Sequence, residues 1–261
     1  MKPILALDLG GTTIKAGLVR GDTVLASDAI PARSHEGLAP QLPRIATLLD
    51  RLAVSAGRSP RDCAGLGLAV PFLVDPVGRR IRSAPREKYA DAATLDLPGW
   101  ARDRFGLDLR LENDAHAALL AEWQYGAGRR TDDFVMLTLG TGIGCSVLIR
   151  GRPLRGKHFQ AGVLGGHLIA RPGDGVPCRA CPARGCYEAE SASQSLPAEF
   201  ADFGTLFARA AAGDAAAIAV RDRCVRYWQA LFVSVVHAYD PVRIVLGGGV
   251  SENPAVRALL P

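Results

Sequence analysis

The sequence predicts an α/β protein built from two similar halves, and two observations lead to this prediction. Segments with the pattern of strands alternate with segments of helical spacing along the 261 residues, and a unit of strand, glycine turn and strand occurs twice. Hydrophobic residues make up 48% of the chain, enough for a substantial core. The chain is therefore expected to be globular rather than disordered.

The first expected element is a β-hairpin around the turn G-G-T-T. Apolar runs flank this turn, and Asp8 stands at the end of the first strand. A carboxylate beside a turn rich in backbone N–H groups can hold a metal ion and a phosphate together. An ordinary hairpin tip has the same composition, so this segment alone leaves both interpretations open.

A second copy of the hairpin favours the phosphate interpretation. When residues 7–21 are shifted by 130 positions, six of the fifteen are identical to residues 137–151. Two such halves would face each other across a cleft and hold a polyphosphate between their glycine turns. The sequence contains neither a Walker A motif nor a dinucleotide G-x-G-x-x-G pattern, which argues against the P-loop and Rossmann classes.

Between the two copies, the sequence predicts helices and strands in alternation. Apolar spacing predicts a helix within 36–57, and apolar runs predict strands at 64–70 and 108–111. Residues 71–100 are rich in proline and charge, so we expect loops that could cap a cleft. Asp114 stands near the start of a helix after the second of these strands. Aspartate at such a position commonly serves as an N-cap, so the sequence position alone does not indicate a catalytic role.

The last third of the chain is predicted to contain a cysteine-rich loop, two helices and a strand. Helices are expected at 206–212 and 214–239, and a strand at 242–246. A third glycine turn at 247–249 follows this strand and precedes a polar helix start, an arrangement suited to nucleotide contact.

The loop at 167–188 is predicted to bind zinc. It contains one histidine and three cysteines, the ligand types of tetrahedral zinc: His167, Cys178, Cys181 and Cys186. A disulfide is the alternative, but the N-terminal segment does not resemble a secretory signal, which favours a metal. The remaining cysteines stand among apolar neighbours and are expected to be buried: Cys63, Cys145 and Cys224.

The charge pattern argues against nucleic-acid binding. The formal net charge of +5 comes from scattered arginines, without interleaved aromatic residues or a recognition-helix pattern. No stretch is apolar for the length of a membrane span. We therefore expect a cytoplasmic protein with neither a nucleic-acid nor a membrane partner.

Five segments in order resemble the ROK (repressor, open reading frame, kinase) family of sugar kinases: D-L-G-G-T-T-I-K-A-G, E-N-D-A-H-A-A, L-G-T-G-I-G, G-G-H followed by C-x-x-C-x4-C-x-E, and L-G-G-G-V. The resemblance covers nearly the whole chain. It implies the duplicated ribonuclease-H-like fold of actin, hexokinase and the Hsp70 ATPase domain, with lobes at 1–113 and 114–261 around a cleft. It also implies that the zinc-binding loop shapes the sugar site. Family members usually continue with a further strand and helix, so a shortened C-terminus is expected.

The resemblance also implies a role for each matching residue. Asp114 matches the catalytic base and its neighbour Asn113 a sugar-binding residue. His167 matches a residue that binds both zinc and sugar, and Glu188 matches a sugar-binding glutamate. The phosphate and adenosine positions match the three glycine turns: Asp8, Gly10, Gly11, Thr12 and Thr13; Gly140, Thr141 and Gly142; Gly247, Gly248 and Gly249.

The implied activity is ATP-dependent phosphorylation of a hexose, glucokinase-like, at the 6-hydroxyl, with Mg2+ and Zn2+. We expect Asp8 to position Mg2+ through water, and the helix N-terminus to keep Asp114 ionised rather than raise its pKa. The resemblance also implies a homo-oligomer, because members of the family are commonly dimers or tetramers.

Three departures from the family pattern leave the sugar open. Phe72 replaces a glycine, Arg86 an asparagine, and Leu164 a glutamate that would accept a sugar hydroxyl. Fructose or an N-acylhexosamine are alternatives to glucose, and a non-catalytic sugar-binding or regulatory protein is a further class. Regulators of the family carry a helix-turn-helix before the first kinase strand, which here starts at Pro3.

Overall fold

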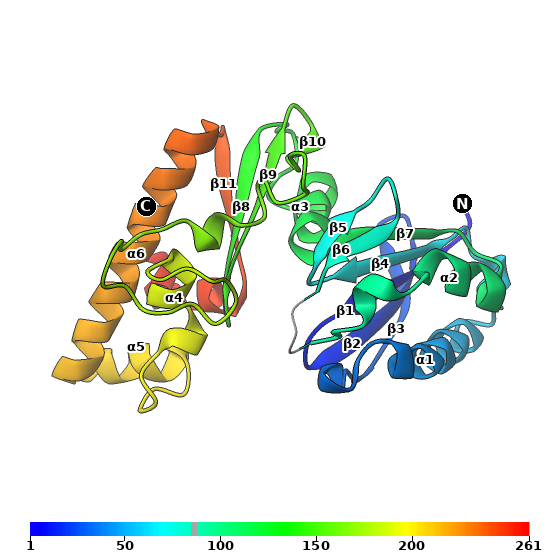
Figure 1. Ribbon diagram of the computed structural model, residues 1–261, viewed down its shortest axis with the longest axis horizontal. Coiled ribbons are helices and arrows are strands. Elements are labelled where there is room, and N and C mark those ends of the chain that lie inside the picture. The colour runs from blue at the N-terminus through cyan, green and yellow to red at the C-terminus, as the bar shows by residue number, and fades with distance from the viewer. Residues whose placement is uncertain (85–87, 261) are drawn as a thin grey trace. The chain divides into compact units, whose positions relative to one another are not determined.

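The computed structural model describes residues 1–84 and 88–260, so Arg86 lies outside the described residues. The chain divides into two compact units, Met1–Ala118 and Leu119–Pro261 (Figure 1). Each unit has its own sheet and its own hydrophobic core.

The first unit is organised on a five-stranded sheet of order β3-β2-β1-β4-β7. Its strands are β1 (Ile4–Leu9), β2 (Thr13–Arg20), β3 (Thr23–Pro31), β4 (Leu66–Val70) and β7 (Leu109–Asn113). The first three strands pair antiparallel, whereas β4 and β7 run parallel to β1. The predicted hairpin with Asp8 in its first strand is confirmed.

Helices cover the sheet of the first unit. The 14-residue helix α1 (Leu42–Ser55) packs on β2 and β3 through the predicted apolar stripe, and α2 (Leu97–Phe105) packs on β7 (Figure 1). Short 3₁₀ turns complete the unit: η1 (Ser34–Glu36), η2 (Ala39–Gln41), η3 (Pro60–Asp62) and η4 (Ala92–Thr94).

The expectation that residues 71–100 form only loops is wrong. They contain a small antiparallel sheet of β5 (Leu73–Asp75) and β6 (Arg80–Ser83), and α2 begins at Leu97. The two strands bury Val74 and Ile81. Strands of three and four residues give too few alternations for a periodic signal, so the sequence pattern did not reveal them.

The second unit repeats the strand order of the first. Its strands are β8 (Phe134–Leu139), β9 (Ile143–Ile149), β10 (Arg152–Pro153) and β11 (Arg243–Gly247). The order β10-β9-β8-β11 matches β3-β2-β1-β4, with the hairpin antiparallel and the last strand parallel in both.

One detail of the predicted duplication needs correction. Leu9 pairs with Ile14 across the first turn, whereas Leu139 pairs with Ile143 across the second. The second turn is thus one residue shorter. The alignment by 130 positions therefore holds up to the turn, and beyond it the strands correspond with a shift of 129.

The second unit is completed by a long helix and several short ones. The helix α3 (Asp114–Tyr125) crosses the division between units; the others are α4 (Tyr187–Ser191), α5 (Phe203–Ala211), α6 (Ala215–Tyr239) and α7 (Pro254–Arg257). The 3₁₀ turns are η5 (Gly165–His167), η6 (Ser193–Ser195) and η7 (Gly249–Glu252).

The core of the second unit is built on α6. This helix, orange in Figure 1, begins after Asp214, whose carboxylate accepts the N–H groups of Ala216 and Ala217, and it buries Trp228. The indole Nε1 of Trp228 donates to the carbonyl of Ser191 at 3.1 Å and so ties α4 to α6.

The three cysteines outside the loop, Cys63, Cys145 and Cys224, are buried as predicted. Across the described ranges, the helices are all too short or too polar to cross a membrane.

Candidate functional site

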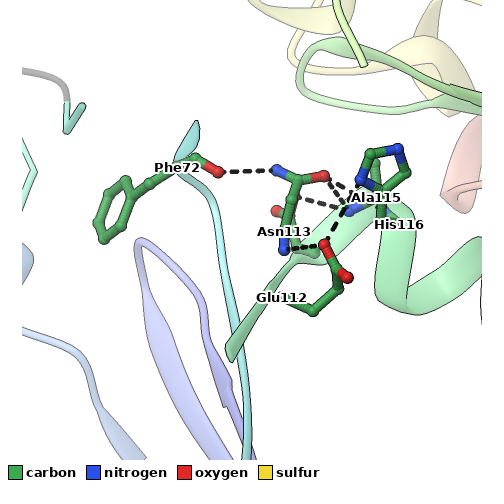
Figure 2. A network of polar contacts seen from close by, with 6 residues as sticks. Phe72, Glu112, Asn113, Ala115 and His116 are labelled. Atoms are coloured by element: carbon green, nitrogen blue, oxygen red, sulfur yellow. Dashed lines mark hydrogen bonds and ion pairs between the residues drawn. The ribbon is translucent and has the colours of Figure 1, made fainter. Parts of the chain in front are cut away.

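The junction between β7 and α3 presents the predicted base. Asn113 is the helix cap, because its Oδ1 accepts the N–H groups of Ala115 (3.0 Å) and His116 (3.2 Å) (Figure 2). Asp114 is the first helical residue and is exposed, and its Oδ1 accepts the N–H of Ala115 at 2.8 Å. The capping duty thus belongs to Asn113, which leaves the carboxylate of Asp114 facing solvent.

The amide of Asn113 is also held from its other end. Its Nδ2 donates to the backbone carbonyl of Phe72 at 3.1 Å. Figure 2 shows the Phe72 ring directed away from Asn113 while its carbonyl points toward it. The ring is 3% exposed and packs edge-on against Tyr89 with centroids 6.0 Å apart. The side chain that replaces the family's glycine therefore belongs to the core of the first unit.

Two residues at this junction were not singled out from the sequence. Glu112 Oε1 accepts the N–H of Asn113 at 2.9 Å and lies 3.4 Å from Nδ1 of His116, which is 2% exposed (Figure 2). These contacts fix the end of β7 against the first turn of α3. Glu112 belongs to β7 and His116 to α3, so no periodicity within a single element marks the pair in the sequence.

The expectation for the pKa of Asp114 is wrong in direction. Although Asp114 is exposed, the surrounding protein partly desolvates its carboxyl and so raises the pKa above its ordinary value, and the negative charge of Asp8 adds to the rise. The backbone N–H of Ala115 opposes it. The helix N-terminus does stabilise the carboxylate, but desolvation is the larger effect.

The first glycine turn joins β1 to β2. A methyl group at Gly10 would lie 2.6 Å from the carbonyl oxygen of Thr13, so the turn closes too tightly for any side chain there. The carbonyl of Thr12 accepts the N–H of Ala32 at 2.9 Å. Asp8 lies in β1, two residues before the turn.

The second glycine turn is tied to Glu188. This residue of α4 is 7% exposed, and its Oε2 accepts the N–H of Ile143 at 2.9 Å. A methyl group at Gly142 would lie 2.5 Å from the same oxygen, and Gln194 Nε2 donates to Oε1 at 3.0 Å. Since a carboxylate has about four acceptor positions, these two bonds do not exhaust the acceptor capacity of Glu188.

The third glycine turn lies against the end of β8. Gly248 has a φ of 87°, and a side chain at this position would collide with the carbonyl oxygen of Leu139. The second and third glycine turns are therefore neighbours within the second unit.

The predicted zinc ligands come together in the loop between η5 and α4. The ligand atoms of His167, Cys178, Cys181 and Cys186 all lie within 4.8 Å of one another. Nδ1 of His167 is 3.8 Å from the sulfurs of both Cys178 and Cys186. A tetrahedral zinc ion with Zn–S bonds of about 2.3 Å needs ligand atoms about 3.8 Å apart, so the group fits.

Two sulfurs of this group also accept backbone hydrogen bonds. The N–H of Ala180 points to Cys178 and that of Ala189 to Cys186, both at 3.4 Å. Bonds of this kind surround the ligands of metal sites and fix their orientation. Leu164, where the family has a glutamate, is 37% exposed.

The repeated sheets and these sites define the class of α/β proteins with the duplicated fold of actin and hexokinase. Within that class the chain belongs to the ROK family, whose sequence model matches residues 4–260.

Individual relatives agree with this assignment. A glucokinase of Thermotoga maritima is 32% identical over 271 residues, which cover 95% of this chain and 82% of that protein. A beta-glucoside kinase of Klebsiella pneumoniae is 29% identical, with 98% and 85% covered. The crystal structure of a ROK hexokinase from Thermus thermophilus superposes with a TM-score of 0.82 at 33% identity and covers 99% of this chain and 86% of that one.

Proposed function

We propose that this protein transfers the γ-phosphoryl group of ATP to a hexose, at the 6-hydroxyl and with glucose as the first candidate. The observation that carries the proposal is the β7–α3 junction. Asn113 is held by three hydrogen bonds, and the exposed carboxylate of Asp114 follows it directly. A sugar bound by the amide would present a neighbouring hydroxyl to the carboxylate.

In this mechanism Asp114 accepts the proton of the attacking hydroxyl. Phosphoryl transfer has a loose transition state that is stabilised mainly by positioning and charge, so the proton leaves late. A pKa above the ordinary carboxyl value makes Asp114 a stronger base than a solvated aspartate. The desolvation around the carboxyl thus supports its proposed role.

The glycine turns are assigned to the nucleotide. Backbone N–H groups of Gly10–Thr13 and Gly140–Gly142 would hold the phosphates, and Gly247–Gly249 would contact adenosine. Asp8 would orient the Mg2+ of the Mg-ATP substrate through water.

Zinc is proposed to be structural. His167, Cys178, Cys181 and Cys186 would occupy all four positions of a tetrahedral ion, which leaves none open for chemistry. Such a site would hold the loop and thereby His167 and Glu188, the two residues proposed to bind sugar.

The acceptor is a hexose or a hexose derivative. The relatives are named for glucose and for beta-glucosides, and Leu164 offers no hydroxyl acceptor where the family has a carboxylate. Fructose and N-acylhexosamines are therefore retained as alternatives, together with a sugar-binding protein without turnover. The burial of Phe72 removes one reason to exclude glucose.

The test is an ADP-release assay over glucose, beta-glucosides, fructose and N-acylhexosamines. Replacing Asp114 with Asn should lower kcat by about 10²–10⁴-fold, because it removes the base and keeps the shape. ATP binding, measured by calorimetry, should be unchanged. Asp103→Asn, at an exposed position of α2, is the matched control. Turnover by Asp114→Asn close to that of the control would refute the assignment of the base.

The homo-oligomeric state, which the family resemblance implies, and the cytoplasmic location belong to the same proposal. Light scattering of the purified chain measures the oligomeric state directly, and a monomer at assay concentrations would contradict it.

A further inference from the structure

The two peptide carbonyls of the first glycine turn are each held by a buried hydroxyl group. Tyr89 donates its phenolic hydrogen to the carbonyl oxygen of Gly10 at 3.0 Å. Ser34 donates from Oγ to the carbonyl oxygen of Gly11 at 2.8 Å. The two donors are 0% and 8% exposed. We call Ser34 and Tyr89 the hydroxyl clamp.

The hydroxyl clamp is itself rigidly supported. The backbone N–H of Tyr89 donates to the carbonyl of Ser34 at 2.7 Å, so the two donors are bonded to each other. The carboxylate of Asp91 accepts the N–H groups of Leu38 (2.5 Å) and Ala39 (2.9 Å), which joins the same two segments a second time. The positions of both hydroxyls are therefore set by packing and backbone bonds.

Tyr89 has further features of a dedicated donor. Its ring packs against the edge of Phe72, in a site without exposed surface. Burial raises the pKa of its phenol to about 12, so the group keeps its hydrogen over the whole physiological range. It adopts a φ of 51°, an uncommon conformation for a residue with a side chain.

Holding the carbonyls fixes the direction of the adjacent N–H groups. In a trans peptide the N–H points opposite to the C=O. Because the carbonyls of Gly10 and Gly11 face the clamp, the N–H groups of Gly11 and Thr12 face the other way. Within residues 1–84 and 88–260, neither N–H has a hydrogen-bond acceptor. The side chain of Lys88 lies against Gly11 and adds a positive charge beside this turn.

The second unit holds its turn in the same way with different atoms. Gly140 and Thr141 stand at the same two positions after β8 as the two glycines do after β1. The carbonyl of Gly140 accepts the N–H of Ser193 at 3.1 Å, and that of Thr141 accepts the N–H of Gln194 at 3.2 Å. Backbone donors here replace the hydroxyls of the first unit. What the two halves share is that the carbonyls of both turn residues accept hydrogen bonds from donors outside the hairpin.

We propose that Ser34 and Tyr89 are positioning residues for phosphate, which fix the N–H groups of Gly11 and Thr12 in the orientation that binds the nucleotide's phosphates. The inference rests on the proposed function, since it takes Gly10–Thr13 as a phosphate-binding turn. Donors oriented before the ligand arrives need no reorganisation when charge develops on it. Free rotation of these two peptides would remove that advantage.

Three variants test the clamp in the full chain. Tyr89→Phe keeps the ring packing and removes one donor, and Ser34→Ala removes the other. Ser34→Thr keeps a hydroxyl, so its Kd and KM for Mg-ATP should stay near those of the wild type. We expect each deletion to raise the Kd and KM for Mg-ATP by about 5-fold or more, and the double variant to multiply the two effects. The KM for sugar should not change. Ser55→Ala is the matched control, because it removes a hydroxyl-to-carbonyl bond of 2.9 Å to Leu52 at the end of α1, away from the turn and from the residues that support the clamp.

Calorimetry with Mg-ATP and the ADP-release assay together separate the outcomes. If the wild type turns over and both deletions leave the ATP parameters like those of Ser55→Ala, the clamp is structural only and the inference is wrong. If the wild type binds ATP without turnover on any sugar, the proposed function fails, and the Kd series still decides the clamp. A wild type that binds no ATP overturns both.

Discussion

Shortening Phe72 to alanine is expected to destabilise the first unit rather than to open a sugar site. The side chain is 3% exposed, and removal of a buried phenyl group costs about 3–5 kcal/mol. The edge-to-face contact with Tyr89 accounts for about 0.5–1.5 kcal/mol of this loss. The backbone carbonyl that holds Asn113 is retained, so sugar affinity of the folded protein should change little.

Urea unfolding followed by circular dichroism measures the loss. Val77→Ala is the control, because Val77 is 89% exposed in the turn of the same small sheet and its truncation should stay within about 0.5 kcal/mol. If Phe72→Ala instead raises kcat/KM for a hexose and costs no more stability than the control, the ring faces the sugar and our placement of Phe72 is refuted.

The remaining predictions concern the metal, the base and the third turn. Metal analysis should find one zinc per chain, lost in the Cys178→Ser, Cys181→Ser double variant together with thermal stability and sugar affinity; zinc retained there would contradict the ligand assignment. Because folding raises the pKa of Asp114, the ionised carboxylate destabilises the folded state at any pH above that raised pKa. The destabilisation is absent below the ordinary carboxyl range, where the group is protonated in both the folded and the unfolded state. Asp114→Asn should therefore unfold at a higher temperature than the wild type at pH 7, and this difference in unfolding temperature should vanish toward a pH of about 4. A difference that grows as the pH falls would contradict the raised direction of the pKa. Gly248→Ala should cost at least about 1–2 kcal/mol more than Gly213→Ala, which has the same φ of 87° but open space, and equal losses would show that the third turn is not tightly packed.

The sequence predicted the elements whose patterns are long or repeated. The 25 residues of α6 carry a helical stripe over many turns, and the hairpin of β1 and β2 has a recognisable turn between two apolar runs. The β5–β6 pair has too few residues for such a pattern. Its existence depends on packing against the neighbouring β7, which a local pattern does not contain.

In the candidate site, too, the features that depend on residue type and spacing were predicted, whereas those that depend on contacts in the folded protein were not. The grouping of the four proposed zinc ligands was predicted from residue type and spacing, because a tetrahedral site needs little more than four such side chains in one loop. The direction of the Asp114 pKa was missed, since desolvation depends on the folded surroundings whereas the helix position is visible in the sequence. Ser34 and Tyr89 carried no motif at all, and they became candidates only through their contacts with the glycine turn.

The short helix α4 connects the metal group to the second glycine turn. Cys186 is both a proposed zinc ligand and the cap of α4, since its sulfur accepts the N–H of Ala189. Glu188 lies two residues further on and accepts the N–H of Ile143 at the turn. Glu190, 2% exposed, accepts the N–H of Val176 at 2.7 Å and so binds the helix back to the loop. A metal that fixes Cys186 would therefore also fix the carboxylate that shapes the turn. A closed zinc site would in this way support the proposed phosphate-binding turn without any chemistry at the ion.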